Sequence, residues 1–119
     1  MNTALWIAQA ILAAVFFYSG MNKSIFSEKQ LIAKGQTGVV NLPLAFIRFI
    51  GVTEIAGAVG IIVPWLLNIA PILTPVSAIG FGVVMIPAAF IHARLREPKN
   101  VATNVILFAL SVFVVWGRI

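Results

Sequence analysis

The sequence has no cysteine, and its 119 residues include only three carboxylates and one histidine. Without cysteine the chain has neither thiol–disulfide chemistry nor thiolate ligands for a metal. One histidine and three carboxylates also make a conventional metal site unexpected, and no haem or other covalent cofactor motif is recognisable. The sequence leaves enzymatic activity open, but it favours a chain that is not an enzyme on its own.

Charge is scarce as well. Charged residues make up 9% of the chain and hydrophobic residues 61%, whereas soluble domains carry about 25% charged residues. Predominantly apolar stretches of roughly 20 residues, enough to span a bilayer, occur at residues 3–21, 44–63, 72–92 and 101–117. The fold class predicted is an all-α integral membrane protein, a four-transmembrane-helix bundle forming one membrane domain over residues 1–119. Prolines place a loop at residues 64–71, and Asn100 is the predicted N-cap of the fourth span.

The first connection carries the pattern of a short helix. Ser27 followed by Gln30 is a capping box, and Gly35 is a helix stop. We therefore predict a short amphipathic interfacial helix between the first and second spans. A flexible turn at residues 35–38 is expected to follow it, with Pro43 in the first turn of the second span.

Basic residues are unevenly distributed between the two sides. The first and third connections hold Lys23, Lys29, Lys34, Arg94, Arg96 and Lys99. The opposite side holds only Arg118, which is expected to anchor the fourth span beside Trp116. The positive-inside rule predicts that both connections are cytoplasmic and both termini periplasmic, in the plasma (inner) membrane of a bacterium. The net charge of +5 then indicates contact with membrane lipids, not with nucleic acid.

Glu54 is the only carboxylate within the predicted spans. A charge at the bilayer centre costs about 2.5–3.5 kcal/mol, so such a residue usually faces a partner, a cavity or a ligand. Arg48 lies six residues earlier, roughly 240° around the helix, and is expected to extend toward the headgroups. The partner of Glu54 is therefore expected on another helix.

Polar side chains from the other spans lie in one half of the membrane, between the depth of Glu54 and the two basic connections. They are Tyr18, Ser19, Lys23, His92, Thr103 and Asn104. Pro87 adds a further polar group, because it leaves the carbonyl of Val83 without a helical donor. Together they predict a polar pocket in which Glu54, Lys23, Arg48, His92, Tyr18, Ser19 and Asn104 bind a ligand and Glu54 handles protons. Two simpler interpretations stay open: Glu54 locks the bundle, and His92 caps its helix end.

Small residues recur at helical spacing in the two central spans, as Ala56 and Gly60 and as Ala78 and Gly82. Such pairs allow close approach of membrane helices. They either pack helices within one bundle or form a homodimer interface.

The order of several motifs resembles the DoxX-like family. The stretch Phe16-Phe-Tyr-Ser-Gly20-Met-Asn-Lys23 is similar to its F-x-x-x-G-x-x-K signature, and Arg48 through Gly57 resembles the opening of its second span. Pro64, Pro75, His92 and Arg118 continue the pattern. The resemblance implies a compact four-helix membrane bundle. It also implies a link to the small subunit of a thiosulfate:quinone oxidoreductase and to respiratory functions, and it makes Gly20, Lys23, Arg48, Gly51, Glu54 and His92 shared positions.

Three functions follow as hypotheses. The first is a bundle that binds a quinone or lipid, or an accessory membrane subunit of an oxidoreductase system with another membrane protein as partner. The second is a structural or assembly protein in which Glu54 locks the bundle. The third is a proton-coupled transporter of the small multidrug type, although the carboxylate of those exporters lies in the first span and this first span has none.

Overall fold

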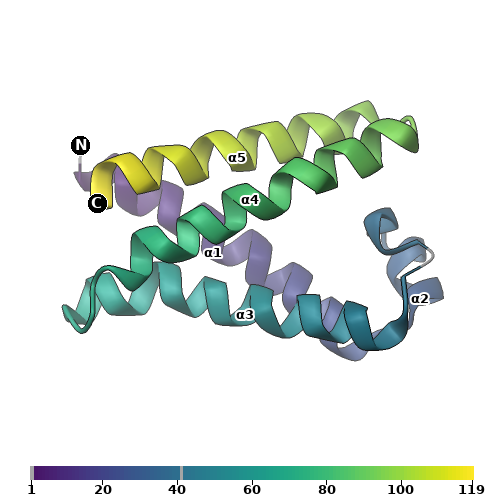
Figure 1. Cartoon of the computed structure of the whole chain (residues 1–119), viewed down its shortest axis with the longest axis horizontal. Coiled ribbons are helices and arrows are strands. Elements are labelled where there is room, and N and C mark those ends of the chain that lie inside the picture. The colour runs from purple at the N-terminus through teal and green to yellow at the C-terminus, as the bar shows by residue number, and fades with distance from the viewer. Residues whose placement is uncertain (1, 41) are drawn as a thin grey trace.

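The computed structural model describes residues 2–40 and 42–119. Met1 and Asn41, which belong to the predicted domain of residues 1–119, lie outside the described residues. The regular elements of the described residues are all helices: α1 (Asn2–Ile25), α2 (Glu28–Ala33), the short 3-10 helix η1 (Thr37–Val39), α3 (Leu44–Leu67), α4 (Leu73–Arg94) and α5 (Pro98–Arg118) (Figure 1). Among the described helices, four are 21–24 residues long and apolar enough to cross a membrane. The predicted fold class is confirmed.

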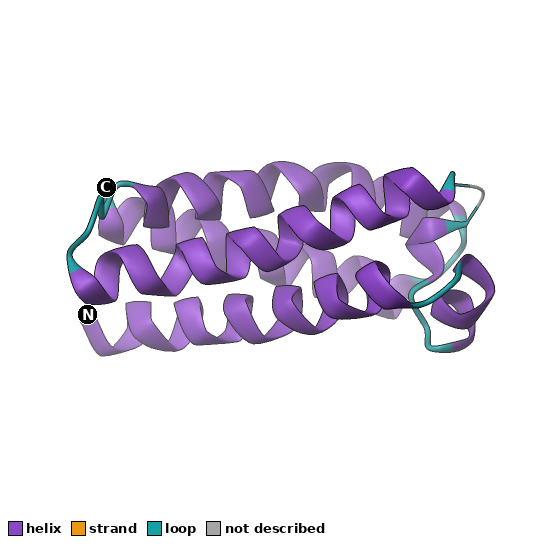
Figure 2. Ribbon diagram, turned by 90° about the horizontal axis from the view of Figure 1, so that it is seen from below, coloured by secondary structure: helices purple, strands orange, loops and turns teal. Residues whose placement is uncertain are grey.

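The four long helices form two pairs. α1 packs mainly against α3, and α4 packs mainly against α5. The rings of Phe16 in α1 and Phe81 in α4 stack with their centroids 3.9 Å apart and join the pairs in the core. Both termini lie at one end of the bundle, called here the terminal end (Figure 1). The connections between α1 and α3 and between α4 and α5 lie at the other, the connection end (Figure 2).

Two predicted helix boundaries were wrong. α3 continues through Pro64 and ends at Leu67, where Asn68 takes the left-handed conformation with φ 54°. Pro64 is tolerated because the carbonyl of Gly60, which it leaves without a helical donor, accepts a hydrogen bond from Thr74 Oγ1 at 3.1 Å. The predicted loop at residues 64–71 therefore begins at Asn68.

At the start of α5, Glu97 occupies the N-cap position and Pro98 the first turn. Proline suits that turn, because the N–H that it lacks would have had no helical acceptor there. The predicted N-cap Asn100 is thus inside the helix.

Glycines allow α1 and α3 to approach closely. A Cβ on Gly20 would lie 2.6 Å from the carbonyl oxygen of Gly51, and a Cβ on Gly51 would lie 2.9 Å from the carbonyl oxygen of Gly20. Of the predicted small-residue pairs, Gly60 contacts Ser77 of α4, and Gly82 is in ordinary contact with α5. These glycines therefore pack helices of the bundle.

The first connection folds back onto the bundle. The predicted capping box is confirmed: Ser27 Oγ accepts from the Gln30 backbone at 3.2 Å, and Gln30 Oε1 accepts from the Ser27 backbone at 3.0 Å. Gly35, with φ +92°, follows the end of α2. The predicted flexible turn at residues 35–38 instead runs into η1, and Pro43 is the N-cap of α3, not part of its first turn. Leu31 is buried in a small second core, which ties α2 to α3.

At the terminal end, the buried side chain of Arg118 joins three of the helices. Arg118 is 6% exposed, its guanidinium carbon lies 4.7 Å from the Trp65 ring centroid and 5.2 Å from that of Trp6, and its Nε donates to Gln9 Oε1 at 2.8 Å. Trp116, its predicted neighbour, is 65% exposed. Arg118 therefore locks α5 to α1 and α3 and does not lie at the surface beside Trp116.

Candidate functional site

A cavity of about 620 Å³ lies at the connection end, between the two helix pairs and under the first connection. Six of the seven predicted ligand-binding residues line it, together with Pro87 and Thr103; the six are Glu54, Lys23, His92, Tyr18, Ser19 and Asn104. Its remaining wall is mainly apolar and includes Phe16, Phe46, Phe49, Ile50, Met85 and Leu107. The polar groups singled out in the sequence thus surround one space.

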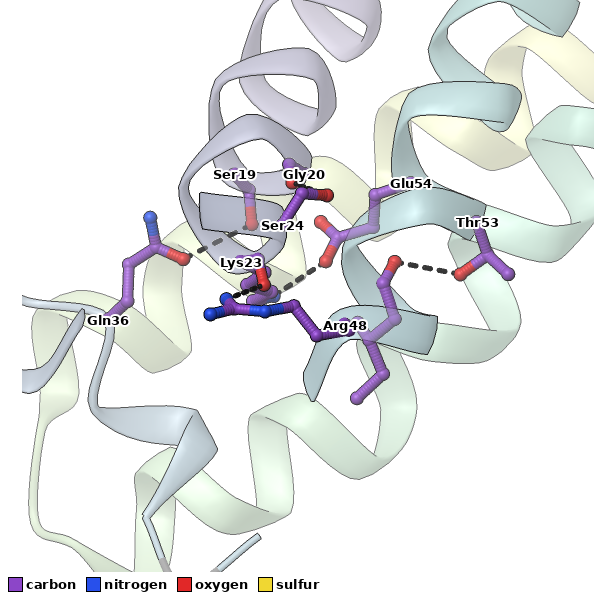
Figure 3. A network of polar contacts seen from close by, with 9 residues as sticks. Ser19, Gly20, Lys23, Ser24, Gln36, Arg48, Thr53 and Glu54 are labelled. Carbon is purple, nitrogen blue, oxygen red and sulfur yellow. Dashed lines mark hydrogen bonds and ion pairs between the residues drawn. The ribbon is translucent and has the colours of Figure 1, made fainter. Parts of the chain in front are cut away.

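Glu54 finds its partner on α1. Lys23 Nζ lies 2.6 Å from Glu54 Oε1, and the two side chains are 18% and 6% exposed (Figure 3). The close approach at Gly20 and Gly51 explains the pairing, because each charged residue follows its glycine by three positions and lies about one turn further along the same helix. The carboxylate is therefore compensated inside the bundle without a ligand.

Arg48 is not part of the cavity wall. Its guanidinium donates to the backbone carbonyl of Lys23 at 2.8 Å (Figure 3). It also donates to the carbonyls of Phe26 at 2.6 Å and Ile25 at 3.3 Å. The carbonyls of Lys23 and Ile25 belong to the last turn of α1, where helical donors are lacking, and that of Phe26 follows directly. Arg48 thus caps α1 and fixes the start of the first connection, and it does not join the other predicted ligand residues at the cavity wall.

His92 pairs with a carboxylate that the sequence analysis did not select. Its Nδ1 lies 2.7 Å from Glu97 Oε1, and the Thr37 hydroxyl donates to both carboxylate oxygens, at 2.7 and 2.9 Å. Hydrogen bonds from His92 first and Thr37 second hold the pKa of the Glu97 carboxyl below its usual value. We call these three residues the latch, because they join the first connection to the turn between α4 and α5.

One feature of the sequence could have indicated half of the latch. The single histidine is followed five residues later by the only carboxylate of the third connection, and a turn between them brings their side chains together. Nothing in the sequence indicated Thr37, because its contact spans 60 residues.

The first connection covers the cavity. Gly35, Gln36, Gly38, Val39 and Leu42 form part of its lining. The Ser19 hydroxyl donates weakly, at 3.4 Å, to Gln36 Oε1 (Figure 3), and a Cβ on Gly38 would lie 3.4 Å from His92 Nε2. This cover is held on the α1 side by Ser19 and on the α4–α5 side by the latch.

Asn104 is a buried polar residue of the wall whose amide nitrogen is unpartnered among the described residues. It is 7% exposed. A buried amide without a partner costs about 1–3 kcal/mol. The described residues include no group of three or more potential metal-ligating side chains, so the site offers hydrogen bonds and apolar contact.

These features define a small integral membrane protein, a bundle of four apolar helices with a polar-lined cavity between its helix pairs. A family model described as the DoxX-like family matches residues 7–114 of the 119. The chain belongs to the DoxX-like family. No curated protein and no solved structure matches the chain.

Proposed function

We propose that this protein binds a lipid-soluble amphiphile, a quinone or a lipid, in the cavity at its connection end. The observation that carries the proposal is the cavity itself: about 620 Å³, within the roughly 300–1,000 Å³ of small-molecule sites. Aromatic and aliphatic side chains would surround the apolar body of the ligand. The polar head would lie near Glu54, Lys23 and Asn104.

The proposed setting is the inner membrane, with the cavity in its cytoplasmic half and both termini periplasmic. The basic connections at that end support this orientation. The ligand would be held for, or presented to, a membrane oxidoreductase partner. If a quinone were reduced there, Glu54 would exchange the proton, since its carboxylate lines the cavity.

A structural role is the second candidate, and the Lys23–Glu54 pair favours it. The pair joins α1 to α3 at 2.6 Å without any ligand, which is what a bundle lock requires. The same pair disfavours cation transport, because the only carboxylate within the described spans already has a cationic partner.

Extraction and mass spectrometry of protein purified in mild detergent would test the proposal. We expect a stoichiometric quinone or lipid with the wild type and a reduced amount with Glu54→Gln. Gly80→Ala, a substitution in open space outside the cavity lining, is the matched control and should retain the ligand. If nothing specific copurifies with a well-folded wild type, the binding function is wrong and the structural role is favoured.

A further inference from the structure

The head group that this cavity accepts follows from its charges. The acidic and basic side chains of the wall are Lys23, Glu54 and His92. Lys23 and Glu54 pair with each other at 2.6 Å, and His92 pairs with Glu97 at 2.7 Å. Each charge in the wall is therefore already opposed by another at contact distance, and the described wall presents no excess of either sign.

An ionic head would have to be buried without a partner of its own. A buried charge that is not compensated is strongly unfavourable, and a ligand that took Lys23 or Glu54 as its partner would leave the other unpaired. An uncharged head avoids both costs.

Among the neutral polar groups of the wall, three hydroxyls already donate within the protein, and the fourth, that of Tyr18, belongs to a side chain that is 61% exposed. Ser19 donates to Gln36, Thr53 to the carbonyl of Ile50, and Thr103 to the carbonyl of Lys99. The amide of Asn104 is different, because its nitrogen has no partner among the described residues. Its terminal torsion is broad and roughly two-fold, so a rotation of that torsion can turn the nitrogen toward the cavity.

We infer that the cavity selects amphiphiles with an uncharged, oxygen-bearing head that accepts a hydrogen bond from the Asn104 amide, and that it rejects carboxylate and quaternary ammonium heads. Asn104 is the residue that determines this specificity. The inference rests on the proposed binding function and adds the class of head group to it.

Three probes with the same alkyl chain separate the possibilities: undecyl methyl ketone, dodecanoate and undecyltrimethylammonium. Binding of each to the purified protein is measured by native mass spectrometry in a neutral detergent. The ketone is expected to bind at least roughly tenfold more tightly than either ion, and Asn104→Leu to weaken the ketone roughly tenfold, the value of one hydrogen bond. Ser111→Ala is the control, since it removes a buried hydroxyl of the same helix outside this cavity.

The outcomes separate a failure of this inference from a failure of the proposed binding function. If no probe binds the folded wild type, the proposed binding function fails. Equal binding of the three probes, or preference for an ion, overturns charge selection and leaves the binding function standing. If the ketone is preferred and a folded Asn104→Leu protein binds it unchanged, the assignment to Asn104 is overturned.

Discussion

Removing one member of the Lys23–Glu54 pair should destabilise the bundle far more than removing both. The carboxylate of Glu54 is 6% exposed and its partner lies 2.6 Å away, so Lys23→Met leaves an uncompensated charge inside the bundle. Breaking a buried pair in this way costs about 3–5 kcal/mol. Glu54→Gln should cost less, about 1–3 kcal/mol, because the longer lysine side chain can extend toward the headgroups.

The double variant Lys23→Met/Glu54→Gln contains no buried charge at this position. We expect its cost to be about 1 kcal/mol, so the sum of the single costs should exceed the double cost by at least about 2 kcal/mol. Equilibrium unfolding by sodium dodecyl sulfate in mixed micelles, followed by far-ultraviolet circular dichroism, measures all four proteins. Additive costs would refute the reasoning, because they would mean that the two side chains do not interact.

Three further predictions concern the packing, the latch and the terminal end. Gly20→Ala should destabilise the bundle by about 1–3 kcal/mol, because its Cβ would lie 2.6 Å from a backbone oxygen, whereas Gly80→Ala, with no atom within 4 Å, should be neutral or stabilising in the same unfolding assay. Because the pKa of Glu97 is lowered in the fold, the latch should hold above the usual pKa of glutamate, about 4.3, and be lost as pH falls through the lowered value. The chain has no cysteine of its own, so maleimide labelling of Val39→Cys reports on the first connection alone. At neutral pH this labelling should be slow relative to that of an exposed cysteine, and adding Glu97→Gln should make it fast. Equal labelling rates with and without Glu97→Gln would contradict the latch. Arg118→Met should lower the stability of the bundle, and Arg118→Lys should not restore it, since an ammonium does not reproduce the stacked guanidinium. Thermal unfolding of the two variants measures this. Wild-type stability in Arg118→Lys would show that the charge alone matters.

The sequence was sufficient for the features that depend on local pattern. The four spans follow from hydropathy and length, and the helix at Ser27 follows from its capping box. The residues around the cavity were predicted because a shared depth in the membrane can be counted along each helix from the basic connections. Glu54 stood out for the same reason, as a charge in an otherwise apolar segment.

Features that depend on contacts between distant segments were not predictable. Pro64 reads as a helix breaker, yet α3 continues through it because Thr74, fourteen residues after Gly60, donates to the Gly60 carbonyl that Pro64 leaves without a helical donor. Arg118 reads as a surface anchor, yet it is buried because Gln9, 109 residues earlier, accepts its hydrogen bond. In both cases the sequence indicated an unsatisfied group but not the group that satisfies it.

The position of the cavity follows from where the helix pairs are joined. Toward the terminal end, α3 is held to α4 by Thr74 and to α1 by Gln9, whose amide donates to the Ile61 carbonyl at 2.7 Å. Toward the connection end, α4 diverges from α3 (Figure 1), and the first connection bridges the two helix pairs through the latch and Ser19. Loops are the less stable parts of a fold, so a bundle built this way keeps one end fixed and leaves access to its cavity under the control of a few hydrogen bonds. The proposed binding function would make use of that asymmetry, because a ligand must enter and leave at one end.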